Sequence, residues 1–136
     1  MVESLRLKKR VTFLGWRNDI ASILKASDIY VHSTHSEGFG IAACEAMATG
    51  LPVVASNVPA LAQVVQGAGV LFPPGNHAEL AQRLSELIAS PELRRKMSQA
   101  SIQRARQFSI EHTVDAYVQL YESVLHAGTR SVAEIR

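Results

Sequence analysis

The sequence predicts an α/β domain with a doubly wound parallel sheet, and three observations support this fold class. Short apolar runs of strand length recur through the first half of the chain. Segments with helical patterns and terminal signals separate these runs, and after the last run only helical patterns follow. Because such alternation is typical of right-handed crossovers, we expect about four parallel strands covered by helices on both faces, with further helices at the carboxyl end.

The predicted elements of the sheet can be placed in order. Strands are expected where β-type residues cluster, at 10–15 (RVTFLG), 28–34 (DIYVHST), 52–56 (PVVAS) and 69–72 (GVLF). Helices are expected between them, at 18–27, 41–50 and 59–67. Asn18 or Asp19 is a candidate cap for the first helix, Gly50 ends the second, and Pro59 begins the third.

Three helices are expected after the last strand, at 76–90, from Pro91 onward, and at 109–125. The first carries an apolar face formed by Leu80, Leu84, Leu87 and Ile88. The last carries an apolar stripe formed by Val114, Tyr117, Val118, Tyr121 and Leu125. We expect these faces to pack, residues 1–10 to be a lead-in, residues 11–127 to form one domain, and residues 128–136 to be a tail.

Composition limits the class of protein. A chain of 136 residues that is 47% hydrophobic and 19% charged can bury a core, so one soluble domain is expected. A net charge of +2 is too small to indicate nucleic-acid binding. Cys44 is the single cysteine, so no internal disulfide can form and a cytoplasmic location is expected. No apolar run approaches the roughly 20 residues of a membrane span.

A glycine-rich turn follows the second predicted strand. In open parallel sheets, ligands bind at the carboxyl ends of the strands, where this turn lies. Gly38 and Gly40 permit a close backbone approach, and the helix from Ile41 offers unpaired N–H groups. A phosphate fits this turn, and a side chain at Gly40 would occupy the phosphate's space. A purely structural turn is the alternative.

Two glutamates flank the turn. Glu45 lies five residues past Gly40, about 7.5 Å along the helix at ~1.5 Å per residue, which is too far to cap its N-terminus. An ionised carboxylate can accept two hydroxyl protons, so the vicinal hydroxyls of a ribose would satisfy Glu45. Glu37, in the loop, would contact neutral hydroxyls at the other end of the ligand. The alternatives are a solvent-facing Glu45 with a turn-stabilising Glu37, or a glycosidase-like carboxylate pair.

The segment EGFGIAACEAMATGLPVVAS resembles the Glu-x7-Glu segment of group 1 glycosyltransferases, which are retaining, nucleotide-sugar-dependent enzymes of the GT-B fold. The resemblance extends through VTFLG, DIYVHS, GVLFPPGNHAELAQRL and RARQFSIEHTVDAYVQLYESVL, from Val11 to Leu125. It implies that this chain is one Rossmann-like half of such an enzyme, the half that binds the donor nucleotide-sugar.

The resemblance also assigns roles to residues. Glu37 matches the catalytic glutamate that contacts the transferred sugar, and Glu45 matches the glutamate that holds the ribose hydroxyls. The turn that faces the diphosphate and the sugar is matched by Gly38, Phe39, Gly40 and Ile41. Arg17 lies in the stretch that flanks the nucleobase. Cys44 is interpreted as a helix-packing residue.

The chain also differs from the family pattern. The Arg and Lys that neutralise the diphosphate have no match here, and the acceptor-binding domain is expected to lie upstream, so this chain alone is expected to be inactive. No Asp-x-Asp motif occurs, so we expect no metal and no cofactor beyond the donor substrate. The alternatives are a non-catalytic nucleotide-sugar-binding module and a structural remnant. Peripheral membrane association of the full enzyme and the identity of its acceptor stay open.

Overall fold

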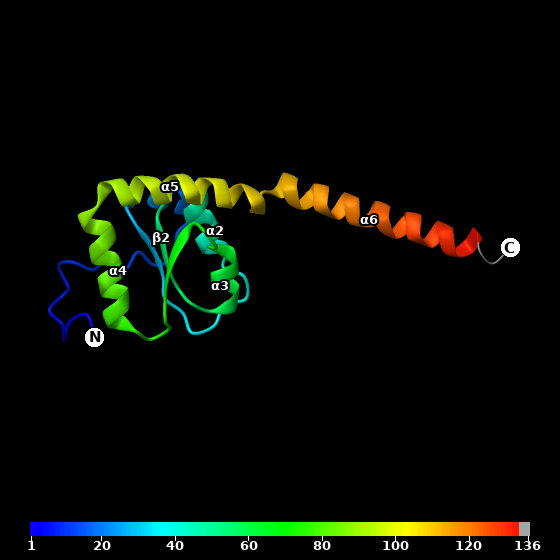
Figure 1. The fold of residues 1–136 in the computed structure, drawn as a ribbon. Coiled ribbons are helices and arrows are strands. Elements are labelled where there is room, and N and C mark those ends of the chain that lie inside the picture. The colour runs from blue at the N-terminus through cyan, green and yellow to red at the C-terminus, as the bar shows by residue number, and fades with distance from the viewer. Residues whose placement is uncertain (134–136) are drawn as a thin grey trace.

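A parallel sheet forms the centre of the structure, a computed structural model that describes residues 1–133, with side chains as far as His126 (Figure 1). The sheet has three strands in the order β1 (Tyr30–His32), β2 (Val53–Ser56) and β3 (Gly69–Phe72). Both neighbouring pairs are parallel, with Tyr30 opposite Val53 and Val53 opposite Gly69. The predicted α/β class and the parallel pairing are therefore confirmed.

Strand β2 is the most buried strand because it has a partner on each edge and helices on each face. All of its residues, Val53, Val54, Ala55 and Ser56, are buried. A continuous apolar run of this kind is typical of a central parallel strand, since neither face meets water. The strand therefore divides the interior of the domain into two layers.

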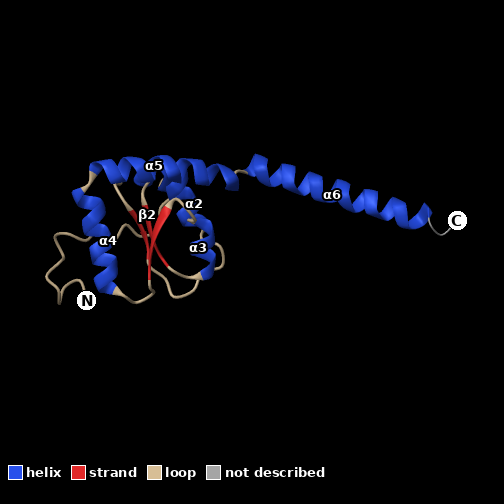
Figure 2. Ribbon diagram, in the orientation of Figure 1, coloured by secondary structure: helices blue, strands red, loops and turns tan. Residues whose placement is uncertain are grey.

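One layer lies between the sheet and the helices α1 (Ile20–Lys25), α2 (Ile41–Ala48) and α3 (Pro59–Val64). Leu24, Met47 and Leu61 from these helices pack in one buried cluster with Val53 and Ala55 of β2. Figure 2 shows α2 and α3 on this side of the strands. This layer fixes the helix that follows the glycine turn against the sheet.

The other layer lies under α4 (His77–Ala89). Val54 and Phe72 from the strands pack there with Leu87 of α4 and Met97 of α5 (Pro91–Ala105). Helix α4 begins at Asn76, whose side-chain oxygen accepts a hydrogen bond from the Glu79 amide at 3.1 Å. The expected cover of helices on both faces is thus observed.

Helix α5 belongs to both layers. It runs across the end of the domain, from α4 to α2 (Figure 1). Its Met97 and Leu93 join the layer under α4, whereas Ala100 and Ala105 pack against the layer under α2 and α3. The helix starts at Pro91, as predicted, and the Ser90 hydroxyl caps it by accepting from the Leu93 amide at 3.1 Å.

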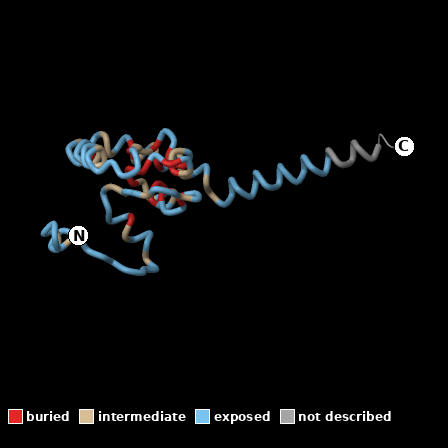
Figure 3. The backbone as a smooth tube through the Cα atoms, turned by 90° about the horizontal axis from the view of Figure 1, so that it is seen from below, coloured by how far each residue is buried: buried red, intermediate tan, exposed pale blue. Residues whose placement is uncertain are grey.

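The strand predicted at residues 10–15 is wrong. The backbone there is irregular, and Phe13 and Leu14 are 81% and 53% exposed. A strand exists only through hydrogen bonds to a neighbouring strand, and this segment forms no ladder with any strand of the sheet. Its β-type residues favour a strand, but the segment has no partner strand to pair with. Figure 3 shows the segment as an exposed loop.

The last helix, α6 (Ile110–Ala133), projects away from the domain (Figures 1 and 3). It meets the rest of the chain chiefly through the short helix η1 (Arg106–Phe108). Its predicted apolar stripe does not pack, since Val114, Tyr117, Val118, Tyr121 and Leu125 are all exposed. The helix includes residues 128–133 of the predicted tail, and residues 134–136 lie outside the described residues. No described helix is both long enough and apolar enough to cross a bilayer.

Candidate functional site

The loop between β1 and α2 leaves the sheet at the carboxyl ends of the strands. The Thr34 amide donates a hydrogen bond to the Ser56 hydroxyl at 3.0 Å, which ties the end of β1 to the end of β2. The Thr34 hydroxyl donates to the Ser36 carbonyl at 2.6 Å. The loop is therefore held to the sheet before the glycine turn begins, at the position where open parallel sheets bind ligands.

Gly40 forms the N-terminus of α2 in a left-handed conformation, with φ 101° and ψ 44°. Its carbonyl accepts the first helical hydrogen bonds, from the amides of Ala43 at 2.9 Å and Cys44 at 3.1 Å. A Cβ at Gly40 would lie 2.6 Å from Leu61 Cδ2, in the buried layer. The expectation that this Cβ would occupy ligand space is thus wrong, whereas a Cβ at Gly38 would point into open space.

Both oxygens of the Glu37 carboxylate have partners. Oε1 accepts a hydrogen bond from the Gly38 amide at 3.0 Å, and Oε2 lies 3.0 Å from His32 Nε2. The Glu37 side chain is 27% exposed, so the carboxylate reaches the surface while staying anchored. The turn-stabilising role and ligand contact are compatible, because each carboxylate oxygen retains a lone pair.

Tyr30 lies behind His32 and was not predicted as a site residue. Its hydroxyl is 3.3 Å from His32 Nδ1, and the two rings meet edge to face. Burial raises the pKa of the Tyr30 phenol, and the negative charges of Glu45 and then Glu37 raise it further. The charges of both glutamates of the predicted motif therefore act in the same direction on the pKa of this phenol.

The signal for Tyr30 and His32 was present in the sequence. They occupy alternate positions of β1, so their side chains share one face of the sheet, and the strand leads directly to Glu37. The apolar appearance of the DIYVHST run concealed that face, since a buried strand and a strand that carries polar site residues have similar patterns.

Glu45 is exposed on α2 and lines a hollow between α1 and α2. The hollow is lined by apolar and small residues, namely Ile20, Ala21, Leu24, Ala48 and Thr49, besides Glu45 itself. Within the described residues, no hydrogen-bond donor or cation pairs with the Glu45 carboxylate. The acceptor-only group is thus available to a ligand that carries hydroxyls.

Phe39 and Ile41 lie in the turn with different surroundings. The Phe39 ring meets the Phe108 ring of η1 edge to face at 5.7 Å, and the Arg104 guanidinium lies 4.9 Å from the Phe108 centroid. Arg104 also donates from Nε to the Val64 carbonyl at 2.9 Å. Ile41 is 68% exposed. The Phe39 side chain therefore links the turn to η1, the short helix that precedes α6.

Arg17 is not brought to the carboxylates. It lies in the exposed segment before α1, where its Nε donates to Asp19 Oδ1 at 2.7 Å. This hydrogen bond raises the pKa of Arg17 and lowers that of Asp19. Asp19 precedes α1 but makes no side-chain cap bond, because its carboxylate faces Arg17. No hydrogen bond or ion pair among the described residues joins Arg17 to Glu37 or Glu45.

The Cys44 thiol is a further candidate for a reactive group. Burial raises the pKa of the Cys44 thiol, and Arg104 offsets only part of this effect, so the thiolate is disfavoured. In the described part of the chain, no three His, Cys, Asp or Glu side chains gather as metal ligands would.

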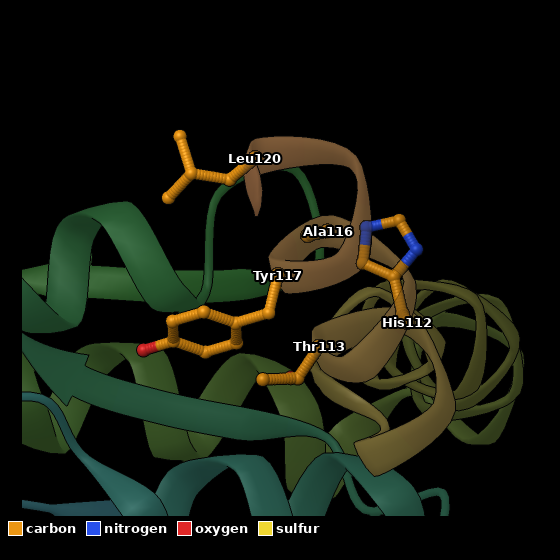
Figure 4. A pocket seen from close by; sticks show the side chains of 5 residues that line it. All are labelled: His112, Thr113, Ala116, Tyr117 and Leu120. Atoms are coloured by element: carbon orange, nitrogen blue, oxygen red, sulfur yellow. The ribbon is translucent and has the colours of Figure 1, made fainter. Parts of the chain in front are cut away.

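A hollow on α6 is lined by side chains of that one helix, namely His112, Thr113, Ala116, Tyr117 and Leu120 (Figure 4).

A family described as "Glycosyl transferases group 1" matches residues 1–104. The chain is similar to the D-inositol 3-phosphate glycosyltransferase of Saccharomonospora viridis, at 31% identity over 119 residues, 86% of this chain and 28% of that protein. It is also similar to the N-acetyl-alpha-D-glucosaminyl L-malate synthase of Bacillus anthracis, at 31% identity over 128 residues, 92% of this chain and 34% of that protein. The chain spans about a third of these relatives.

Among solved structures, the fold is similar to that of Anabaena HepE in complex with UDP. The TM-score is 0.85 at 29% sequence identity, and the match covers 90% of this chain and 35% of HepE. HepE is also known in complex with UDP-glucose, with a TM-score of 0.83 to this chain. The arrangement of strands, turn and helices described above is therefore shared with a protein that binds a nucleoside diphosphate and its sugar.

Proposed function

Because the chain belongs to the group 1 glycosyltransferases, we propose that it is the donor-binding half of a retaining enzyme. The enzyme transfers a sugar from a nucleoside diphosphate sugar to an acceptor, and this chain supplies one half of its GT-B fold. The observation that carries the proposal is the pair of carboxylates, Glu37 and Glu45, which flank the Gly40 turn and both reach the surface.

Glu45 is the ribose-binding residue in this proposal. Its carboxylate is exposed, faces a hollow beside α1, and has no hydrogen-bond donor of its own within the described residues. Two vicinal hydroxyls supply the two donors that such an acceptor takes, whereas a phosphate would be repelled. The apolar walls formed by Ile20 and Leu24 suit the flat face of a nucleobase next to that ribose.

The turn and Glu37 hold the rest of the donor. The first amides of α2, together with the positive end of its helix dipole, face a diphosphate that lies over Gly38, where a ligand meets no side chain. Glu37 accepts from the hydroxyls of the transferred sugar through its remaining lone pairs and acts as the catalytic carboxylate. No metal is needed in this proposal, because the N–H groups offset part of the leaving-group charge.

Replacing Glu45 with alanine tests the ribose assignment. We expect Glu45→Ala to weaken binding of a nucleoside diphosphate by about 1.5–3 kcal/mol, the range for a hydrogen bond to a charged group. Calorimetric titration with UDP, GDP and ADP measures the change. Glu122→Ala, which removes the same charge from the exposed face of α6, is the matched control and should bind as the parent does. Equal affinities of the two variants, with both folded, would contradict the assignment.

Transfer by these 136 residues alone is a separate test. We expect the chain to bind a nucleotide-sugar weakly and to transfer nothing, because reaction requires donor and acceptor to be held together in reactive geometry. The chain spans about a third of its relatives, which leaves room for an acceptor-binding half elsewhere in such enzymes. The measurement is product formation from radiolabelled UDP-, GDP- and ADP-sugars with a panel of acceptors. Turnover by the monomer would refute this expectation.

A binding module without catalysis is the second candidate, because the anchoring of Glu37 by the Gly38 amide and by His32 would serve such a module equally well. The two candidates differ once the chain is combined with an acceptor-binding half of a related enzyme. A donor half restores transfer in the mixture and loses it in Glu37→Gln, whereas a binding module restores none.

A further inference from the structure

Three side chains, Tyr30, His32 and Glu37, form a continuous series of polar contacts from the interior of the domain to the loop. The Tyr30 hydroxyl is 3.3 Å from His32 Nδ1, and His32 Nε2 is 3.0 Å from Glu37 Oε2. The other oxygen of Glu37 accepts from the Gly38 amide at 3.0 Å. The carboxylate is therefore held from two sides, by a side chain of β1 and by the backbone of the turn.

The chemistry of the partners fixes the direction of these bonds. An ionised carboxylate only accepts, so at the 3.0 Å contact with Glu37 the proton is assigned to His32 Nε2. In the neutral imidazole, Nδ1 is then an acceptor, and the Tyr30 hydroxyl is the donor that it faces. Burial and the nearby carboxylate charges raise the pKa of Tyr30, which keeps its hydroxyl protonated and able to donate.

The series is anchored at Tyr30 and reaches the surface at Glu37. Tyr30 is half-buried, the His32 side chain is 17% exposed, and the Glu37 side chain is 27% exposed. A free glutamate side chain samples several rotamers, and fixing one of them costs conformational entropy when a ligand binds. In this protein the Glu37 rotamer is already fixed when the chain folds, so ligand binding does not have to order it. A lone pair stays free on each Glu37 oxygen.

We propose that Tyr30 and His32 are positioning residues that hold the Glu37 carboxylate in the orientation that meets the sugar of a bound donor. The inference rests on the proposed function, since Glu37 contacts sugar only if the chain binds a nucleotide-sugar. It goes beyond that function by assigning to Tyr30 and His32 the preference for a nucleotide-sugar over the free nucleotide. Neither residue contacts the donor in this proposal. His32 acts through Glu37, and Tyr30 acts through His32.

The test compares two ligands on one protein. The parent chain is titrated with UDP and UDP-glucose, and with the corresponding GDP and ADP pairs, and the pair that binds best is used for all variants. In His32→Ala we expect the ratio of sugar-nucleotide affinity to nucleotide affinity to fall about three- to tenfold, the range for losing one pre-ordered side chain. Affinity for the nucleotide alone should change less than about twofold, because Glu45 and the turn are untouched.

Two further variants separate positioning from a general loss of structure. Tyr30→Phe removes one oxygen atom and keeps the ring, so it should lower the ratio in the same direction by a smaller factor. His32→Gln returns an N–H donor near the position of Nε2 and should restore part of the ratio lost in His32→Ala. Nitrogen NMR of the imidazole adds a readout without ligand: Tyr30→Phe should shift Nδ1, and Glu37→Ala should shift Nε2.

The outcomes distinguish the two proposals. If the parent binds a nucleotide and prefers its sugar, but the ratio is unchanged in His32→Ala and Tyr30→Phe, the positioning role is overturned while the proposed function stands. If both affinities fall together in His32→Ala and His32→Gln does not rescue either, the role is structural and the inference is likewise overturned. If the parent binds none of the nucleotides, the proposed function fails and the inference fails with it.

Discussion

Replacing Gly40 with valine is expected to lower the free energy of unfolding by about 2–5 kcal/mol. Two effects add: a side chain at φ 101° costs about 1–2 kcal/mol, and overpacking a filled core typically costs about 1–3 kcal/mol. The overpacking follows from the 2.6 Å separation between an added Cβ and Leu61 Cδ2, since Leu61 is fully buried and any shift of its side chain would press on the cluster around it. Urea denaturation followed by far-UV circular dichroism measures the loss.

Gly38→Ala is the matched control for this substitution. It lies in the same turn, its φ is not in the left-handed region, and an added Cβ meets open space. We expect its stability to equal that of the parent or to rise slightly, because alanine restricts the unfolded chain. A similar loss in both variants would show that the turn tolerates no side chain for reasons other than Leu61 and the backbone angle.

Phe72→Ala is expected to cost about 3–5 kcal/mol of stability, as truncations of buried phenylalanine commonly do. Phe72 ends β3, is 1% exposed, and fills the layer between Val54 and Leu87. Alanine removes its contacts and leaves a cavity that the flanking strand and helix cannot close without moving apart. Since domains are stable by only about 5–15 kcal/mol, a substantial unfolded fraction should be visible at moderate temperature.

Phe13→Ala provides the comparison for Phe72. It removes the same atoms from a side chain that is 81% exposed in an irregular segment, so we expect a change within about 0.5 kcal/mol. Circular dichroism is preferable to fluorescence for both variants, because Trp16 is 90% exposed and its emission would change little on unfolding. A large effect of Phe13→Ala would mean that residues 10–15 pack in solution as the sequence pattern suggested.

The sequence was most informative where one residue type is strongly preferred at an element boundary. Pro59 and Pro91 begin α3 and α5 as predicted, and Gly50, with φ 82°, follows the end of α2. These positions are governed by local backbone geometry, which does not depend on distant residues. The strands β1, β2 and β3 were also predicted, because short runs of β-type residues alternate there with helical patterns.

The sequence failed where the outcome depends on a partner. The apolar residues of segment 10–15 and of α6 indicate a buried face, but they do not say what covers it. Pairing and packing are properties of two segments together, so propensity in one of them cannot decide the result. Both segments show the same effect, since their apolar side chains are present and exposed.

In the candidate site too, features set by local sequence were predicted and features that depend on distant contacts were not. Glu37, Gly38, Gly40 and Glu45 were predicted from type and spacing, and the structure places them in one loop and the following helix. The contact of Glu37 with His32, and that of His32 with Tyr30, could not be predicted, because they depend on the side-chain geometry of β1 relative to the loop. The Arg17–Asp19 pair likewise competes with the cap predicted for Asp19, a choice that spacing leaves open.

The position of α5 across both layers determines how the domain should unfold. Met97 and Leu93 lie in the layer under α4, while Ala100 and Ala105 lie against the layer on the opposite face. Neither layer can therefore be exposed to water without detaching the helix that completes the other. Despite its two separate apolar clusters, the domain should lose both in one cooperative transition, with no populated state in which the strands keep one cover and have lost the other.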